Sequence, residues 1–217
     1  MKKLLLIGAV ACLTQIANSQ TRFGIRGGLN LANVKIDATY MGQSASQTGT
    51  SVATFHIGGM ADVPISEHFS FQPSLLLSGM GSNFDDGSGG TSKIRPYYLT
   101  VPLLLIAKTT LPNTNFSIFG GAGPSVAYGL FGKATSQGQS EDVFGADGFK
   151  RFDFGVDLTA GAELPSGFHF SFHFVPGLAD IGPGSDPSTP DLTFKVKNKL
   201  IQFSIGYFLS GGGTSSK

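Results

Sequence analysis

The chain contains 217 residues, of which 13% are charged, 31 are glycine, 19 are phenylalanine and one is cysteine. Because soluble proteins average roughly 25% charged residues, an ordinary soluble surface is not expected. The formal net charge is +1, which gives no electrostatic argument for nucleic acid as a partner.

The first 19 residues have the features of an export signal. Two lysines follow Met1, an apolar run extends over residues 4–16, and the small residues Ala17 and Ser19 occupy the positions that signal peptidase requires. We expect this segment to be removed after export, which would leave the mature chain without cysteine. Lipid attachment at Cys12 is the less favoured alternative. After this segment, the sequence has no apolar run of the roughly 18 residues that a membrane-spanning helix needs.

Beyond residue 20, apolar residues alternate with polar or small ones at the period of two that is typical of β-strands. The runs cover residues 21–34, 53–65, 69–81, 97–108, 116–131, 151–164, 168–178 and 199–209. The clearest is RFDFGVDLTAGAEL at 151–164, in which every second residue is Phe, Val, Leu or Ala. All eight are long enough for a tilted membrane-crossing strand, which needs roughly 9–11 residues.

The connections between these runs alternate in length. Those at 66–68, 109–115 and 165–167 are short, whereas those at 35–52, 82–96, 132–150 and 179–198 are long and rich in glycine, serine, aspartate and threonine. Short turns at one rim and long loops at the other are typical of outer-membrane barrels. The sequence therefore predicts an all-β fold for residues 20–209: an eight-stranded antiparallel up-and-down transmembrane β-barrel. Both termini would be periplasmic, the long loops solvated, and residues 210–217 a flexible tail.

A soluble barrel with an apolar interior is the alternative. Its polar outer face would be rich in lysine and glutamate, but here the polar face is mostly glycine, serine, threonine, alanine and asparagine. The apolar face also carries aromatic residues where membrane interfaces are expected. Those for the periplasmic side are Phe23, Phe69, Phe116, Phe168 and Tyr207, and those for the opposite side are Tyr97, Tyr128 and Phe152. These features favour the transmembrane barrel, with outer-membrane lipid around it.

Six stretches carry a family resemblance. They are FGIRGGLNLANV, FHIGGMADVPISEHFSFQPSLLLSGMG, YYLTVPLLLIAK, FSIFGGAGPSVAYGL, FDFGVDLTAGAEL and LIQFSIGYFL, and they span most of the chain from Arg22 to Leu209. They resemble the small outer-membrane β-barrel family of Bacteroidetes that includes the PorT-like proteins. The resemblance implies this fold and location; some members are implied in protein secretion and many are called porins. The sequence departs from the family at Ser74 and Thr100, where an acidic residue is common, and at Leu209, where an aromatic residue is.

The interior of an eight-stranded barrel is just wide enough for side chains to fill it. We therefore expect a structural network of polar side chains that plugs the lumen, rather than a wide pore. Its predicted members are Arg22, Arg26, His56, Asp62, Arg151, Asp153, Asp157, Glu163, His169 and His173. A path for protons or ions along the same groups is the less favoured alternative.

The stretch FHFSFHF at 168–174 places two histidines four residues apart. On a helix His169 and His173 would share one face, but on a strand four residues span roughly 13 Å, which is too far for one metal ion. We expect no metal and no cofactor, with the phenylalanines facing lipid and the histidines the lumen. A tight turn at 165–167 would place Glu163 opposite His169.

No pattern in the sequence predicts an enzyme. None of the four histidines falls in a long loop, and a Gly-x-Ser-x-Gly motif is absent. The expected function is a structural or interaction role at the cell surface, in a monomer that meets a surface or periplasmic protein partner. A narrow porin or transport channel is the alternative, and a lipid-modifying enzyme at the loop rim is less favoured still.

Overall fold

The computed structural model describes residues 21–41, 43–85, 90–145, 148–182 and 192–209. The predicted export signal and the predicted C-terminal tail lie outside these ranges. The described part of the chain contains no helix with the length and apolar character needed to cross a membrane.

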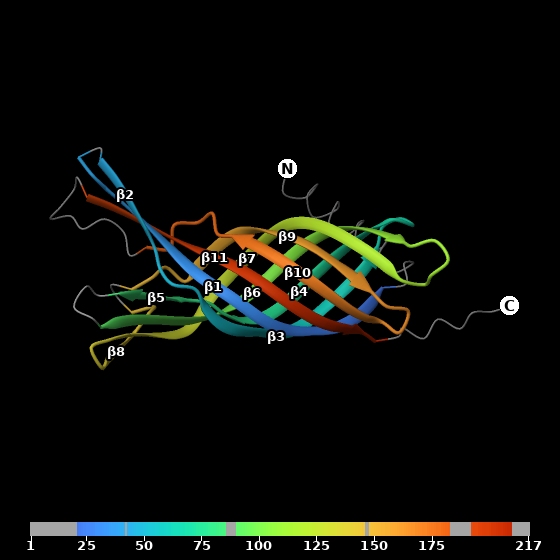
Figure 1. Ribbon diagram of the computed structural model, residues 1–217, viewed down its shortest axis with the longest axis horizontal. Helices are drawn as coiled ribbons and strands as arrows, with labels where there is room; N and C mark the ends of the chain where they lie inside the picture. The colour runs from blue at the N-terminus through green and yellow to red at the C-terminus, as the bar shows by residue number, and fades with distance from the viewer. Residues whose placement is uncertain (1–20, 42, 86–89, 146–147, 183–191, 210–217) are drawn as a thin grey trace, which may run out of the picture.

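Eight strands form a closed antiparallel barrel (Figure 1). They are β1 Arg22–Tyr40, β3 Val52–Pro64, β4 Phe69–Gly79, β6 Thr91–Thr110, β7 Ser117–Ser136, β9 Phe152–Glu163, β10 Phe168–Pro176 and β11 Leu192–Phe208. Each pairs with the next in this order, and β11 pairs with β1 to close the ring. Closure satisfies the backbone hydrogen bonds of every barrel strand within the sheet, which a membrane interior requires. The predicted fold is confirmed.

Strand β1 shows how the alternating sequence sets the two faces. Ile25 and Leu29 point outward and are 61% and 63% exposed, whereas Arg26 and Asn30 point inward and are 2% and 0% exposed. An apolar outer face around a polar interior is the arrangement of a membrane barrel and the reverse of a soluble one.

The strands extend further at the loop end than the sequence predicted (Figure 1). Strand β1 continues to Tyr40, β6 begins at Thr91, β7 continues to Ser136 and β11 begins at Leu192. Three short strands pair with these extensions: β2 Gln43–Thr48 with β1, β5 Ser82–Asp85 with β6, and β8 Gln139–Asp142 with β7. The expectation that 35–52, 82–96 and 132–150 are solvated loops is therefore wrong for much of their length. Their polar residues still form hairpins, because ladder hydrogen bonds do not need an apolar face.

The short turns and both ends of the barrel chain share the other rim. Arg22 begins β1 and Phe208 ends β11, and these strands pair from Gly24–Phe208 onward. In the turn after β9, Gly167 has a φ of 90°, which favours glycine, and the Leu164 N–H donates to the Phe168 carbonyl at 2.8 Å. The predicted tight turn is confirmed.

Candidate functional site

The candidate site is the barrel lumen, which side chains fill at three levels. We call these the short-turn cluster (Arg22, Asp62, Lys108 and Glu163), the central network around Arg26, Asn30, His56, Asp157 and His173, and the loop-end cap around Tyr98, Val143, Phe144 and Ile181.

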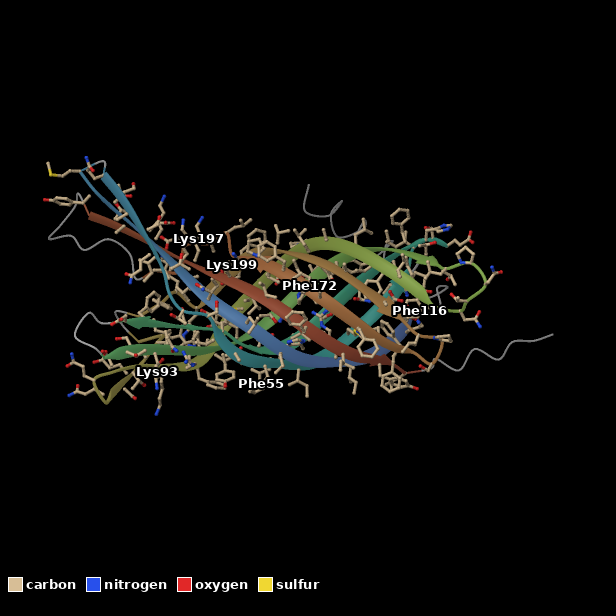
Figure 2. The ribbon with its side chains drawn as sticks, in the orientation of Figure 1. Phe55, Lys93, Phe116, Phe172, Lys197 and Lys199 are labelled. Carbon is tan, nitrogen blue, oxygen red and sulfur yellow. The ribbon has the colours of Figure 1, made fainter. Side chains whose placement is uncertain are left out.

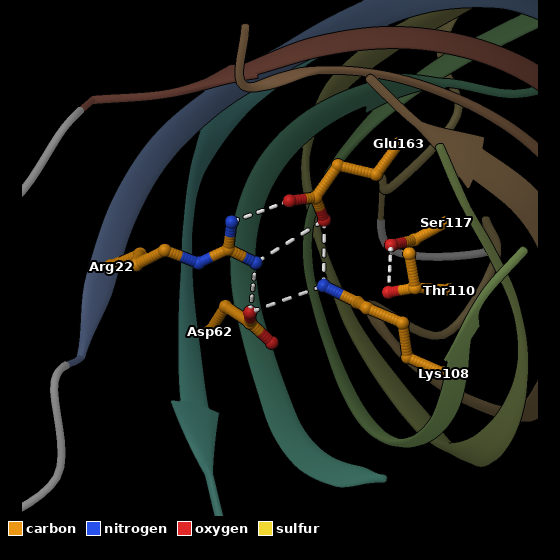
Figure 3. A network of polar contacts seen from close by, with 6 residues as sticks. All are labelled: Arg22, Asp62, Lys108, Thr110, Ser117 and Glu163. Carbon is orange, nitrogen blue, oxygen red and sulfur yellow. Dashed lines mark hydrogen bonds and ion pairs between the residues drawn. The ribbon is translucent and has the colours of Figure 1, made fainter. Parts of the chain in front are cut away.

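The short-turn cluster joins two cations and two carboxylates from four strands (Figure 3). The Arg22 guanidinium lies 2.5 Å from both Asp62 Oδ2 and Glu163 Oε1. The Lys108 ammonium lies 2.6 Å from Glu163 Oε2 and 3.7 Å from Asp62 Oδ2. The formal charges cancel, so each charged group, although partly removed from water, has an opposite charge beside it.

An aromatic ring covers this cluster. The Arg22 guanidinium lies 4.3 Å from the centre of the Phe208 ring, and the Lys108 ammonium lies 6.0 Å from it. Phe208 is 3% exposed. Cations over an aromatic face are attracted by its quadrupole. The last residue of β11 therefore holds the cluster in place at the short-turn rim.

Sequence reasoning missed Lys108, although a signal for it was present. It lies in the nearly all-apolar run at 97–108, whose facing the sequence left unclear. Thr100 is polar and inward, and Lys108 lies an even number of residues from it on the same strand. The period of two therefore places Lys108 in the lumen as well.

The central network contains a buried chain of three groups. Arg26 Nη1 lies 3.0 Å from His173 Nε2, and His173 Nδ1 lies 2.9 Å from Asp157 Oδ1. Because arginine only donates, Nε2 accepts, and the imidazole proton is on Nδ1, which donates to Asp157. His173 is 1% exposed and Asp157 is 0% exposed. A neutral imidazole thus joins one buried cation to one buried anion.

A second chain of hydrogen bonds surrounds Asn30. Asn30 Oδ1 lies 2.7 Å from His56 Nδ1 and accepts a bond of 3.0 Å from Gln202 Nε2. The other imidazole nitrogen, His56 Nε2, lies 2.8 Å from Ser204 Oγ. Asn30 Nδ2 donates to the carbonyls of Phe55 and Gly79. These bonds join four neighbouring strands, β4, β3, β1 and β11, on the inner face of the barrel.

Some inward polar atoms form no hydrogen bond to another protein group. Among the described residues these include Arg26 Nε, Arg26 Nη2 and His169 Nδ1. Within the same ranges, no group of three or more His, Cys, Asp or Glu is arranged to hold a metal ion.

The structure divides the prediction for FHFSFHF into two parts. Phe168, Phe170 and Phe172 are exposed and His169 and His173 buried, as expected, and His169 is the register partner of Glu163. No hydrogen bond joins these two side chains, however. The Glu163 carboxylate binds Arg22 and Lys108 instead, and the His169 ring packs 5.0 Å from the Phe208 ring.

Two predicted network residues lie nearer the loop end. Arg151 precedes β9, and its guanidinium donates to the carbonyls of Gly129 and Leu130 and lies 5.0 Å from the Phe144 ring. Arg151 therefore lies beside the loop-end cap, and no hydrogen bond or ion pair joins its side chain to another of the described residues predicted for the network. Asp153 is buried and accepts a bond of 2.7 Å from Asn198 Nδ2.

The loop-end cap closes the lumen with apolar side chains. Val143 and Phe144 follow β8 and belong to a buried apolar cluster. Its other members are Tyr98, Met80, Leu200, Ala32, Val52 and Ala127. The Tyr98 and Phe144 rings meet edge to face at 5.5 Å. Ile181, at 0% exposed, packs with Val34 and Val196. The sequence placed Val143, Phe144 and Ile181 in solvated loops, so this level was not predicted.

Asp180 holds in place the part of the cap formed by Ile181, Val34 and Val196. Its Oδ1 accepts hydrogen bonds from the backbone N–H groups of Val196 at 2.9 Å and Gly182 at 3.0 Å. Partial burial acts to raise the pKa of this carboxyl, but these bonds and the charges of Lys150 and Lys195 hold it below its usual range. Asp180 is therefore an anion at neutral pH, and it ties the segment that carries Ile181 to β11.

Comparison with known proteins identifies the class of this barrel. The family model described as outer membrane protein beta-barrel domain matches residues 15–182. The structure of OprG from Pseudomonas aeruginosa aligns with a TM-score of 0.53 and 16% identity, covering 89% of this chain and 98% of that one. This likeness concerns the fold.

Two other solved structures align at lower scores. Neisserial surface protein A has a TM-score of 0.43 and 10% identity over 86% of this chain and 97% of its own. Ail of Yersinia pestis has a TM-score of 0.36 and 13% identity over 85% of this chain and 98% of its own. Comparison with curated proteins gave no match.

Proposed function

Because the chain belongs to the outer membrane protein beta-barrel domain family, we propose that it is a closed-lumen barrel whose loop-end strands perform a structural or interaction role at the cell surface. The observation that carries this proposal is the filling of the lumen at three levels: an ion cluster, a hydrogen-bonded network and an apolar cap. A lumen filled in this way leaves the strand extensions as the part available to partners.

The proposal includes an orientation. Residues 1–19 act as a removed export signal. The short turns and both termini face the periplasm. The extended ends of β1, β6, β7 and β11, with the short strands β2, β5 and β8, lie on the extracellular side. A closed ring has no free barrel edge, which supports a monomer in outer-membrane lipid. The partner is a surface or periplasmic protein, and the PorT-like resemblance favours a secretion-associated one.

We expect the loop end to be accessible from outside intact cells. Cys12 is the only cysteine in the sequence, so a cysteine introduced elsewhere reports its own position. The Ala45→Cys variant, on exposed β2, should react with a membrane-impermeant maleimide in intact cells. The matched Glu67→Cys variant, in a short turn, should react only after the outer membrane is permeabilised. The reverse pattern would overturn the orientation.

The second candidate is a narrow channel, favoured by the buried charges of the central network. We expect the refolded protein to show no discrete conductance steps in planar bilayers, because the cap and the cluster close both ends of the lumen. Insertion is checked on the same sample by the heat-modifiable gel mobility of a folded barrel. Regular single-channel steps from the inserted protein would favour the channel over the closed barrel.

The structure offers little support for an enzyme at the loop rim. Hydrolysis with an activated serine or water usually needs a general base, most often histidine. His56, His169 and His173 are buried in the lumen, and His68 lies in a short turn. The proposal is therefore non-enzymatic.

A further inference from the structure

A row of lysines marks the outward face of the barrel where β1 meets β11. Lys195, Lys197 and Lys199 alternate with the buried residues Val196 and Asn198, so their side chains point away from the lumen. Lys35 of β1 is the register partner of Lys197. Figure 2 shows Lys197 and Lys199 next to each other, with Phe172 further along the wall. Four cations are therefore concentrated on two paired strands.

Few acidic groups balance these cations. Lys35 forms an ion pair with Asp37 at 2.8 Å. Hydrogen bonds from Lys35 and Ser46, and the charge of Lys197, keep the pKa of the Asp37 carboxyl below its usual range. Lys197 and Lys199 form no ion pair with any residue in the described ranges. Successive outward residues of a strand are roughly 7 Å apart, close enough for two ammonium groups to bind one phosphate.

The wall next to these lysines is apolar. On β11, Phe203 and Ile205 follow on the same outward face and are 53% and 55% exposed. Lys199 also lies at the boundary, with its ammonium 5.5 Å from the centre of the Phe174 ring. A lysine in this position keeps its charge at the headgroup level while its stem covers apolar surface.

This apolar wall contains a shallow groove that spans four strands. The small residues Gly27, Ala160 and Ala162 lie among the larger side chains of Phe170, Phe172 and Phe203, and the groove has a volume of about 540 Å³. Its lining is almost entirely apolar. Phe203, which lines the groove, lies four residues from Lys199 on the same strand. The groove therefore begins roughly 13 Å from Lys199. The chemistry changes from cationic to apolar along one continuous surface.

The opposite wall differs at the same level. There Tyr97 of β6 stacks on Phe131 of β7, with the ring centres 5.1 Å apart. Such an aromatic pair is typical of a membrane interface. The two lysines above it have acidic neighbours: Lys133 is the register partner of Asp142, and Glu141 lines a groove with Lys93. The β1–β11 side therefore differs in placing lysines above an almost entirely apolar groove, whereas the groove beside Lys93 is lined largely by polar residues.

From this surface we infer a binding site for a phosphate-bearing lipid of the outer leaflet. Its phosphate binds Lys197 and Lys199, with Lys35 beside them, and one of its acyl chains lies in the groove around Ala160. This inference rests on the orientation proposed above, which places the lysines at the outer leaflet. A lipid fits because it carries an anionic group and an apolar chain, and the surface is complementary to both.

The test uses the refolded mature chain in detergent micelles, with lipid binding measured by native mass spectrometry. The probe is diphosphoryl lipid A. The double variant Lys197→Gln with Lys199→Gln should bind it at least about tenfold more weakly, since each charge-assisted contact to phosphate is lost. The control Lys93→Gln with Lys133→Gln removes the same charge from the opposite wall and should stay within about twofold of the unmodified protein. Equal losses in both double variants would overturn the site.

Further binding measurements separate the contribution of the phosphate from that of the acyl chain. Dephosphorylated lipid A should lose most of the binding, and inorganic phosphate should compete only weakly, because it lacks the chain. Ala160→Leu, which fills the groove and leaves the lysines intact, should weaken lipid binding about threefold. If inorganic phosphate binds as tightly as the lipid, the site is for a free anion and the lipid inference is wrong.

These measurements also distinguish this inference from the proposed function. Micelles have no inside and outside, so lipid binding in them does not depend on orientation in the cell. Loss of binding with normal cysteine labelling would overturn the lipid site alone. Binding with reversed labelling would overturn the orientation alone.

Discussion

We expect the Glu163→Ala variant to lose about 3 kcal/mol of unfolding free energy, because its carboxylate is shared by two cations. Glu163 accepts hydrogen bonds from both Arg22 and Lys108, and its side chain is only 12% exposed. Without it, Asp62 remains as the one carboxylate between two cations. Urea unfolding of the refolded protein in detergent micelles, followed by heat-modifiable gel mobility, would measure the change.

The matched control for this variant is Glu67→Ala. Glu67 is also a glutamate at the short-turn rim, but it is exposed in the turn between β3 and β4. Its replacement should alter stability by less than about 0.5 kcal/mol. A double variant, Glu163→Ala with Lys108→Ala, should be less destabilised than the sum of the two single changes, because the pair is coupled. If Glu163→Ala and Glu67→Ala unfold at the same urea concentration, the cluster does not stabilise the barrel.

Asp157→Ala should have an effect of about 4 kcal/mol in the same measurement. Asp157 is fully buried and accepts the hydrogen bond of His173, which in turn accepts from Arg26. Its loss leaves the buried Arg26 guanidinium without the negative charge at the other end of this chain of hydrogen bonds, and an uncompensated buried charge costs about 3–5 kcal/mol.

Two further variants identify the cause. Asp157→Asn keeps an oxygen that can accept from His173 Nδ1 but removes the negative charge. We expect it to recover about half of the loss if the hydrogen bond and the charge contribute similarly. Asp37→Ala removes an aspartate of the β1 extension whose side chain is 29% exposed and pairs with Lys35 at the surface. It should change the unfolding midpoint little, because surface ion pairs contribute little to stability. An Asp157→Ala midpoint equal to that of Asp37→Ala would contradict a stabilising role for the central network.

The inward and outward faces of the barrel were predictable from the sequence because a strand has only two faces. Once Arg26 and Asn30 face inward, the period of two places Ile25 and Leu29 outward, and a closed ring leaves no third environment. The same rule correctly placed His56, Asp157 and His173 on the inner face. Long apolar alternation therefore determined the eight strands.

The contacts inside the lumen could not be predicted in the same way. The bond of Arg22 to Glu163 joins residues 141 positions apart, and it depends on the stagger of strands around the ring. The cap was missed for a different reason. Val143 and Phe144 stand in a segment of polar and small residues, and only the folding of that segment back over Tyr98 buries them. The periodicity of a short stretch of sequence does not indicate whether a loop segment folds back over the barrel.

The position of the short-turn cluster bears on how the barrel assembles. Its four charged residues come from β1, β3, β6 and β9, and the Phe208 ring that covers two of them comes from β11. No two of them share a strand. Arg22 and Asp62 are register partners on neighbouring strands, whereas the contacts of Arg22 with Glu163 and with the Phe208 ring cross the seam that closes when β11 meets β1. The final pairing of β11 with β1 thus completes the electrostatic balance and the hydrogen-bonded ring in one step. Partly closed intermediates should be sparsely populated, and insertion should proceed as a cooperative transition in which the first and last strands meet late.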